Sequence, residues 1–157
     1  DNDWIEDWNL KLFGYIRIMR ALFPIMHDGG GGRIVNIIGN AGRKADPAYL
    51  AGGGANAALM NITKGIAAMG GPHNILVNAI NPGPTRTERW DSLNEQLAFE
   101  WKMSSSKVES KRMENNPMKR PCEPSEIASL AVFLVSERAS YINGAIIDME
   151  GGSNCCI

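Results

Sequence analysis

Apolar residues recur at intervals of three and four over the first part of the chain, which is the spacing of one face of an α-helix. The pattern predicts a helix over residues 4–27, with these apolar positions: Trp8, Leu12, Tyr15, Ile16, Met19, Leu22, Phe23 and Met26. Pro24 should bend or end the last turn, because proline has no N–H to offer the helix. Four consecutive glycines, residues 29–32, then predict an exit loop.

Three short runs rich in β-branched residues predict strands that are buried on both faces. They are residues 33–38, 74–80 and 144–148. A proline–glycine turn at 81–83 should end the second strand.

Two more helices are predicted between and after these strands. Residues 49–69 are rich in alanine and glycine and carry few charges, so we expect a helix that packs closely on another surface. A second helix is expected over residues 125–137, with Ser125 as its N-cap because a serine hydroxyl accepts an orphan backbone N–H. Residues 88–116 form a polar, helical insertion.

The elements therefore alternate as helix, strand, helix, strand, helix, strand. This alternation favours an α/β fold in which crossover helices connect parallel strands. The prediction is a Rossmann-like, doubly wound parallel sheet without internal repeats or a linker between domains.

Composition and charge exclude several classes of function. The 157 residues are 44% hydrophobic and carry a formal net charge of −1, so no electrostatic footprint for nucleic acid or an anionic membrane exists. No apolar run approaches the length of a membrane span, and residues 1–4 lack the features of a signal peptide. Cysteine is sparse, with Cys122 alone and Cys155 beside Cys156, where an ordinary disulfide would be strained. We predict a reduced, cytoplasmic protein.

Histidine is equally sparse, and the sequence predicts no metal site. His27 and His73 sit at predicted helix ends and have no cysteine or carboxylate partners at metal-ligand spacing. Capping or solvated roles are the simpler interpretation of both side chains.

A series of short motifs, in order along the chain, resembles the short-chain dehydrogenase/reductase family. Each motif is weak alone, and the series is specific. It comprises Asn9 to Lys11, residues 32–37 with Ala41 and Gly42, Val77 to Gly83 followed by Thr87, residues 118–121 and 123–127, Phe133 and Leu134, Ala139 to Gly144, and Gly151 with Gly152.

The resemblance implies NAD(P)-dependent oxidation of an alcohol or reduction of a carbonyl. It covers the C-terminal part of the family's single domain, in which residues 88–116 would cover the substrate. The family's opening strand, glycine-rich turn and helix N-terminus, which hold the cofactor pyrophosphate, have no counterpart here. Residues 29–32 follow a helix and precede a strand, so they are a connector and not a phosphate cradle. We therefore expect the chain to be a fragment of a longer protein.

The family's catalytic serine, tyrosine and lysine positions fall on Gly39, Gly52 and Asn56. In the family, the tyrosine passes a proton to or from the substrate oxygen, the lysine lowers the tyrosine pKa and holds the ribose, and the serine holds the substrate oxygen. Glycine has no proton to give, and asparagine carries no positive charge. The sequence predicts an impaired or non-standard catalyst.

Two weak catalytic candidates remain. Tyr49 is the only phenol near the vacant positions, although a tyrosine at the start of a helix is an ordinary surface residue. Asn9 matches the family asparagine that holds a water beside the lysine, and it could equally cap helix backbone.

By resemblance, the candidate contacts to NAD or NADP lie at the ends of the first two strands and the helix between them: Ile37, Asn56, Pro82, Gly83, Thr85 and Thr87. Glycine after a strand lets backbone approach a flat ring, and a threonine hydroxyl suits a carboxamide. An ordinary strand-ending turn explains Pro82 and Gly83 equally well.

A second function stays open beside the enzyme. The chain could be a non-catalytic homologue that binds a ligand or another subunit. In the family the helices corresponding to residues 4–27 and 49–69 pack across a subunit interface, so we expect a homodimer or homotetramer through them. The expected ligand of the enzyme is a small alcohol or carbonyl compound.

Overall fold

A parallel sheet of three strands forms the centre of the computed structural model, which describes residues 1–154. The strands are β1 (Gly32–Ile37), β2 (Ile75–Pro82) and β3 (Ile146–Met149), in the order β1-β2-β3. In the register, Ile34 lies opposite Val77 and Ile80 opposite Ile147. Cys155 and Cys156, between which the sequence predicts no ordinary disulfide, lie outside the described residues.

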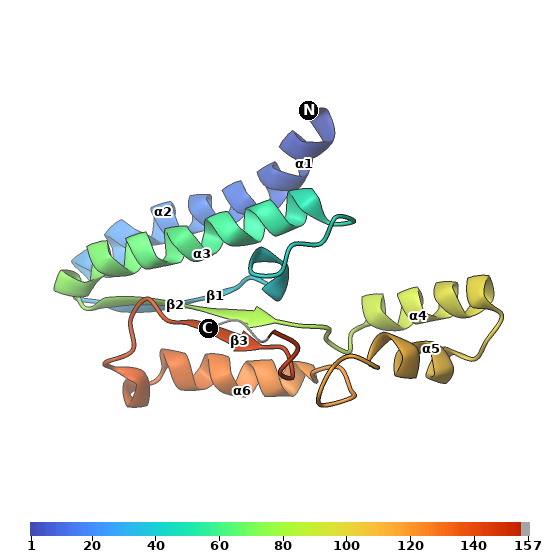
Figure 1. The fold of residues 1–157 in the computed structure, drawn as a ribbon. Coiled ribbons are helices and arrows are strands. Elements are labelled where there is room, and N and C mark those ends of the chain that lie inside the picture. The colour runs from blue at the N-terminus through green and yellow to red at the C-terminus, as the bar shows by residue number, and fades with distance from the viewer. Residues whose placement is uncertain (155–157) are drawn as a thin grey trace.

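Helices cover both faces of this sheet, as the doubly wound prediction requires (Figure 1). The helices α1 (Asn2–Leu10), α2 (Leu12–Asp28) and α3 (Leu50–Gly70) lie on one face. On the other face lies α6 (Pro124–Val135). Short 3-10 turns at Asn40–Gly42, Gly71–His73 and Glu137–Ala139 complete the connections.

The core consists of two apolar layers, one on each side of the sheet. Leu59 of α3 is fully buried against the β1–β2 side, and Ile80 packs with Leu134 of α6 on the other. Since β2 is central, seven of its eight residues are buried. This burial explains why its sequence is mostly apolar without a regular alternation, and its two polar residues, Asn78 and Asn81, are buried as well.

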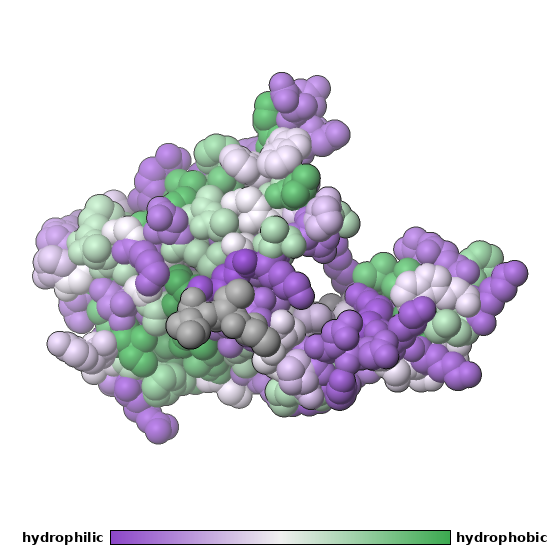
Figure 2. Space-filling view, viewed as in Figure 1, coloured by the Kyte–Doolittle hydropathy of each residue, from purple (hydrophilic) through white to green (hydrophobic). Residues whose placement is uncertain are grey.

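The predicted insertion is a helical hairpin that projects from the body of the molecule (Figure 1). It consists of α4 (Glu88–Trp101) and α5 (Ser105–Arg112), and the space-filling view shows an open notch between it and the helices above the sheet (Figure 2). Its root is fixed by Arg86, which pairs with Glu109 at 2.8 Å and with Glu123 at 3.0 Å. Glu109 also accepts a hydrogen bond from the Trp90 indole at 3.0 Å.

The first predicted helix is two helices, which meet at Lys11. Trp8 donates a hydrogen bond to the carbonyl of Ala51 at 2.9 Å, and Lys11 donates one to the carbonyl of Ile38 at 2.9 Å. These hydrogen bonds join α1 to α3 and the start of α2 to the end of β1. The two helices therefore pack on different elements and are not one continuous helix. The periodicity of apolar positions does not reveal such polar anchors.

Two predicted boundaries are wrong: the end of the second strand and the N-cap of the last helix. Pro24, which was expected to bend or end the last turn of its helix, does not end it, because α2 continues to Asp28. The strand predicted to stop at residue 80 runs through Pro82, since Asn81 and Pro82 still pair with β3.

Ser125 is not the N-cap of the last helix. Glu123 holds that position, and its backbone N–H donates to the side chain of Glu126 at 2.8 Å in a capping box. A reciprocal pair of this kind satisfies two orphan N–H groups, which one serine hydroxyl cannot do.

No helix among residues 1–154 combines the length and the apolar character that a membrane crossing needs.

Candidate active site

The predicted catalytic positions meet at the carboxyl ends of β1 and β2. Gly39 follows β1 with a φ of 131°, which strongly favours glycine. A Cβ at this position would lie 3.1 Å from the side-chain nitrogen of Asn56 on α3. Gly39 and Asn56 are therefore neighbours, as the resemblance requires.

Asn56 is buried with one polar atom unpaired. Its side chain is 2% exposed, and its Oδ1 has no hydrogen-bond partner within the described residues. An unpaired buried carbonyl oxygen costs free energy. A ligand that donates a hydrogen bond here would remove this cost.

Tyr49 fills the space beside the predicted tyrosine position. It lies immediately before α3, and its ring and hydroxyl occupy the space that a Cβ on Gly52 would enter. The ring is 42% exposed, so solvent reaches its other side. The phenol of Tyr49 therefore occupies the space of a side chain at residue 52, and its hydroxyl lies beside Gly52 on the surface of α3.

A proline at the end of β2 releases a backbone carbonyl at this edge. Ile38 donates its N–H to the carbonyl of Ile80 at 2.8 Å, so in a parallel ladder its own carbonyl should accept from residue 82. Pro82 has no N–H, and the ammonium of Lys11 binds the Ile38 carbonyl instead. Burial, and then the positive charge of Arg89, lower the pKa of Lys11.

The segment after β2 turns backbone groups toward the open side of the site. The Pro84 carbonyl and the Arg86 N–H both bond to the backbone of Cys122, each at 2.9 Å. Since successive groups of an extended chain point in opposite directions, the N–H and carbonyl of Thr85 face away from Cys122. The Thr87 hydroxyl accepts from the Trp90 N–H as the N-cap of α4 and keeps its own O–H to donate.

The other predicted site residues have mainly structural contacts. Asn9 faces solvent, and its Oδ1 accepts a hydrogen bond from Arg17 at 2.6 Å. Ile37 is 38% exposed and its carbonyl accepts from the Tyr15 hydroxyl at 2.5 Å. Gly83 fits closely against the chain after β3, because a Cβ there would lie 2.9 Å from the Cα of Glu150.

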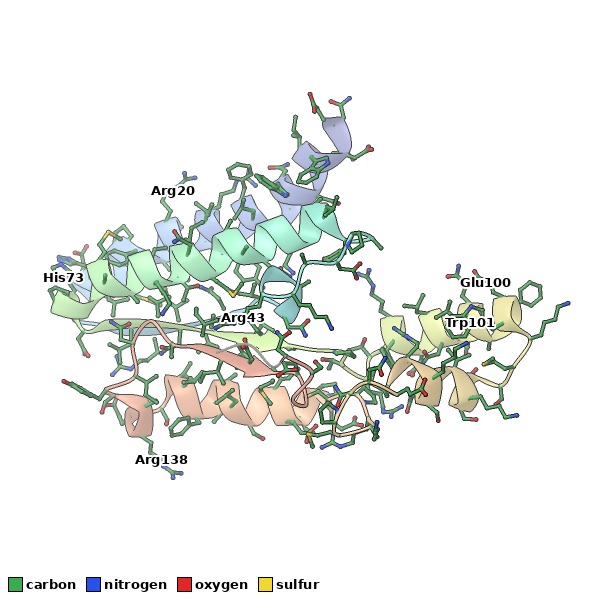
Figure 3. All side chains as sticks on the ribbon, viewed as in Figure 1. Arg20, Arg43, His73, Glu100, Trp101 and Arg138 are labelled. Atoms are coloured by element: carbon green, nitrogen blue, oxygen red, sulfur yellow. The ribbon has the colours of Figure 1, made fainter. Side chains whose placement is uncertain are left out.

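An ion pair ties the loop after Gly39 to the sheet. Arg43 binds Asp148 of β3 at 2.9 Å, and Asp148 also accepts from Asn81 at 2.9 Å (Figure 3). The loop is therefore held over the same carboxyl edge. His73, labelled in Figure 3, lies at the opposite end of the sheet, where its ring meets that of His27 at 4.5 Å between centroids.

The projecting hairpin carries apolar side chains of two kinds. Trp90 is buried, and the Arg112 guanidinium stacks on its ring at 3.7 Å. Phe99, at the far end, is 88% exposed. The stacked pair holds the hairpin together, and only the remaining side chains are free to cover a ligand.

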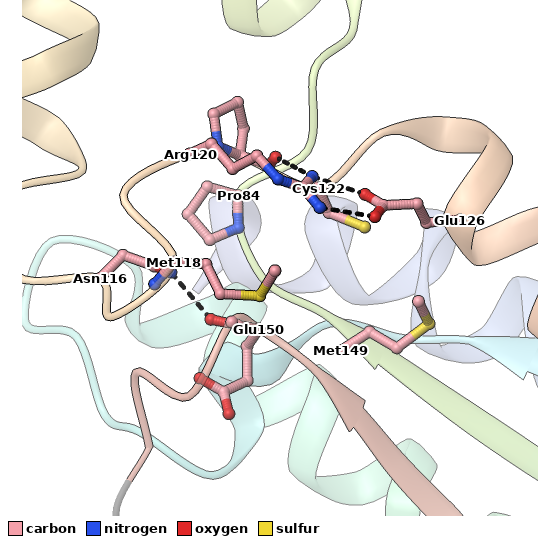
Figure 4. Close-up of a pocket in the computed structure, with 10 residues that line it drawn as sticks. Pro84, Asn116, Met118, Arg120, Cys122, Glu126, Met149 and Glu150 are labelled. Carbon is pink, nitrogen blue, oxygen red and sulfur yellow. Dashed lines mark hydrogen bonds and ion pairs between the residues drawn. The ribbon is translucent and has the colours of Figure 1, made fainter.

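A small, partly open pocket lies on the α6 side of the sheet (Figure 4). It measures about 120 Å³ and is lined by Pro84, Met118, Cys122, Met149 and Glu150 among others. Its wall includes the Arg120–Glu126 ion pair at 2.7 Å. Cofactor-sized ligands occupy pockets of roughly 300–1,000 Å³, so this one holds at most a small group.

Within residues 1–154 no cluster of three or more histidine, cysteine or carboxylate side chains is arranged to hold a metal ion.

The sequence analysis did not single out Lys11, whose ammonium reaches the end of β1. It belongs to a motif that was recognised for Asn9 alone. Its role depends on the ladder register, which pairs the Ile38 carbonyl with a proline, and no sequence pattern gives that register.

Comparison with known proteins agrees with this geometry. A family model described as enoyl-(acyl carrier protein) reductase matches residues 1–154. The chain is 38% identical to the NADPH-dependent reductase BacG of Bacillus subtilis (strain 168), over 98% of this chain and 61% of that protein. The chain belongs to the short-chain dehydrogenase/reductase family.

Two solved structures of the family are informative. L-sorbose reductase from Gluconobacter frateurii, complexed with NADPH and L-sorbose, has a TM-score of 0.95 and 30% identity, covering 100% of this chain and 60% of that one. An NADPH-bound short chain oxidoreductase from Pseudomonas aeruginosa PAO1, described as containing an atypical catalytic center, has a TM-score of 0.87 and 26% identity. It is matched over 100% of this chain and 59% of that one. The chain thus spans about 60% of the length of these relatives.

Proposed function

We propose that the chain belongs to an NAD(P)-dependent oxidoreductase that reduces a carbonyl compound or oxidises the corresponding alcohol. The observation that carries this proposal is the unpaired polar group of Asn56, buried at the carboxyl edge of a parallel sheet. Ligands of open α/β sheets bind outside this edge. Membership of the family and the NADPH dependence of the Bacillus relative support the choice of cofactor.

The residues present fit the nicotinamide end of such a cofactor. A carboxamide needs one acceptor and one donor, which the backbone of Thr85 offers, and the Thr87 hydroxyl adds a second donor. A ribose hydroxyl would donate to Asn56 Oδ1. When bound, the reduced cofactor supplies a hydride, and the residues of this chain orient it and handle the proton.

The standard tyrosine–lysine pair plays no part in this proposal. Gly52 offers no proton, and Asn56 no charge, so the reaction needs a different acid. A missing general acid typically costs 10²–10⁴-fold in rate. We infer a slow or rearranged catalyst, not a copy of the family mechanism.

Titration of the full-length protein with NADH and NADPH, followed by cofactor fluorescence, tests the proposal. Binding of either cofactor, reduced in the variant Thr87→Val, is the expected result. Ser104→Ala is the matched control, because Ser104 is likewise an N-cap, that of α5, and its hydroxyl accepts a hydrogen bond from the backbone N–H of Lys107. Flat titrations with both cofactors would contradict the proposal.

A second candidate function is subunit association through the first helices. The outer side of α2 exposes Ile18, Leu22 and Ile25, and an apolar hollow of about 260 Å³ between α2 and α3 is lined by Phe23, Ile66 and Met69 among others. Exposed apolar patches of this kind are typical of interaction surfaces. We propose a homodimer or homotetramer through this face, with or without catalysis.

Light scattering decides on association. A monodisperse monomer at micromolar concentration would exclude it. If an oligomer forms, Ile25→Glu should dissociate it, whereas Val132→Glu, an exposed apolar residue on α6, should not.

A further inference from the structure

The ammonium of Lys11 is a half-buried cation at the edge where the catalytic pair is vacant. It binds the carbonyl of Ile38, the residue directly before Gly39. Gly39 in turn contacts Asn56 through the space a Cβ would fill. Lys11, at the junction of α1 and α2, therefore brings a positive charge to the site. The predicted lysine position on α3 holds the uncharged Asn56 instead.

This position is built by three features of the chain. Pro82 leaves the Ile38 carbonyl without a ladder donor, the break between α1 and α2 falls on Lys11, and the lysine stem spans the distance from helix to sheet. An ammonium has three N–H donors, and one is used on Ile38. Two donors remain for a ligand beside Gly39.

We propose that Lys11 is the catalytic acid of this site, giving its proton to the substrate oxygen during carbonyl reduction. The proposal rests on the proposed oxidoreductase function. The hydride of NAD(P)H brings two electrons to the carbonyl carbon, and the C=O π pair moves to the oxygen. That oxygen takes a proton from the Lys11 ammonium, and the neutral amine regains one from water. The cofactor is oxidised and the carbonyl compound is reduced to an alcohol.

The surroundings of Lys11 suit an acid. Its pKa is below the ordinary lysine value because burial disfavours the charged form and Arg89 repels it. A lower pKa makes the ammonium a better proton donor near neutral pH. The other titratable group beside it is Tyr15, which binds the adjacent carbonyl of Ile37 and whose pKa burial raises, so it stays neutral.

Steady-state kinetics of variants tests the proposal. Deuterated NADPH is the hydride donor, and L-sorbose and ethyl acetoacetate are the probe carbonyl compounds. Lys11→Met should lower kcat about 10²-fold or more, the loss expected for a general acid. Lys11→Arg keeps the charge but holds its proton too tightly, so it should also be slow. Lys64→Met is the matched control, because Lys64 likewise donates to a backbone carbonyl, that of Gly144, at 3.1 Å, and it should stay within about twofold.

The pH profile separates an acid from a merely structural lysine. In the wild type, kcat/KM for reduction should be high while Lys11 is protonated and fall as pH rises through its pKa. Lys11→Met should lack this alkaline limb and still bind NADPH with wild-type affinity. An unchanged limb, or unchanged kcat, would overturn the role of Lys11 and leave the proposed function intact. Loss of NADPH binding in Lys11→Met alone would likewise overturn it, since Lys11 would then serve binding.

A titration independent of turnover covers the case in which neither probe reacts. Reductive ¹³C-methylation labels the lysines, and the resonance absent from Lys11→Met identifies Lys11. It should titrate at lower pH than an ordinary lysine, because burial and then the charge of Arg89 lower the pKa of Lys11. Titration at the ordinary lysine pKa would overturn the proposal, whereas absence of cofactor binding by the wild type would overturn the proposed function itself.

Discussion

The phenol ring of Tyr49 lies against the α-carbon of Gly52, in the space that any side chain at residue 52 would have to enter. Residue 52 is the position at which the sequence resemblance predicts the catalytic tyrosine of the family. The two residues are three apart on one face at the start of α3. Tyr49, the N-cap of α3, thus occupies the space beside Gly52, and a new side chain at residue 52 fits only if the Tyr49 ring moves away.

Stability measurements can detect this packing. Glycine to alanine inside a helix normally stabilises by about 0.5–1 kcal/mol. Gly65→Ala should gain this amount, since no described atom lies within 4 Å of its added Cβ. Gly52→Ala should gain less or lose stability, because the Tyr49 ring must swing into solvent. Urea unfolding of both variants compares them, and an equal gain would contradict the packing.

Restoring the catalytic pair should depend on Tyr49. The double variant Gly52→Tyr, Asn56→Lys should not raise turnover while Tyr49 is present. In a Tyr49→Ala background the same double variant should raise it, because the new phenol then has room. Steady-state kinetics compares the wild type, the double variant, Tyr49→Ala and the triple variant. An equal gain in turnover with and without Tyr49 would show that Tyr49 and a tyrosine at residue 52 do not compete for space.

Tyr49 itself should contribute little to proton transfer. Its hydroxyl lies beside the Gly52 backbone, at the place of a Cβ, whereas the hydroxyl of a tyrosine at residue 52 would extend beyond that place. Tyr49→Phe should therefore change kcat by less than about tenfold, well short of the 10²–10⁴-fold loss of a general acid. A larger loss, with cofactor affinity unchanged, would make Tyr49 the acid in place of Lys11.

The root of the hairpin should respond to acid. The hydrogen bonds from Arg86 and Trp90 lower the pKa of Glu109. A carboxylate with a lowered folded pKa adds stability above its unfolded pKa of about 4.3, and this stability disappears as pH falls through the folded value. Glu109→Gln should cost about 1–2 kcal/mol at pH 7, since the pair is partly exposed, and almost nothing in strong acid.

Denaturant unfolding of this variant at pH 7 and pH 3 measures the difference. Glu114→Gln is a suitable control, because Glu114 is an exposed carboxylate just after the same helix. An equal cost at both pH values would mean that the charge of Glu109 is not what holds α4 to α5.

The start of α6 offers a test of the corrected N-cap. Glu126→Ala removes both the capping contact to the Glu123 N–H and the ion pair with Arg120, which lowers the pKa of Glu126 to about 2. Losing both contacts should lower the melting temperature of the Glu126→Ala variant. Ser125→Ala should change stability by less than about 0.5 kcal/mol. Thermal unfolding compares the two, and the reverse order would restore Ser125 as the cap.

The sequence was sufficient for the order of elements and for the parallel sheet. The mostly apolar run of residues 75–80, in which only Asn78 is polar, marks a central strand because burial on both faces removes any alternation. The exact ends of the helices and strands were harder to predict from the sequence. Pro24 was expected to bend or end the last turn of its helix. The helix α2 continues past it, because the single missing hydrogen bond near its end is offset by packing of Phe23 and Met26 on the core.

The candidate site could be only half predicted. Motif order located Gly39, Gly52 and Asn56, and the structure brings Gly39 and Asn56 together. The overlap of Tyr49 with Gly52 depends on the rotamer of one side chain, and the position of Lys11 depends on which residue faces Ile38 across the ladder. Both are facts of three-dimensional register, which spacing along one chain does not encode.

The strand order leaves β1 at the border of the sheet among the described residues, with Ile37 half open to solvent. A border strand presents a row of backbone donors and acceptors that accepts any extended chain of suitable register. The outer side of β1 is therefore the place at which a further strand of suitable register would pair.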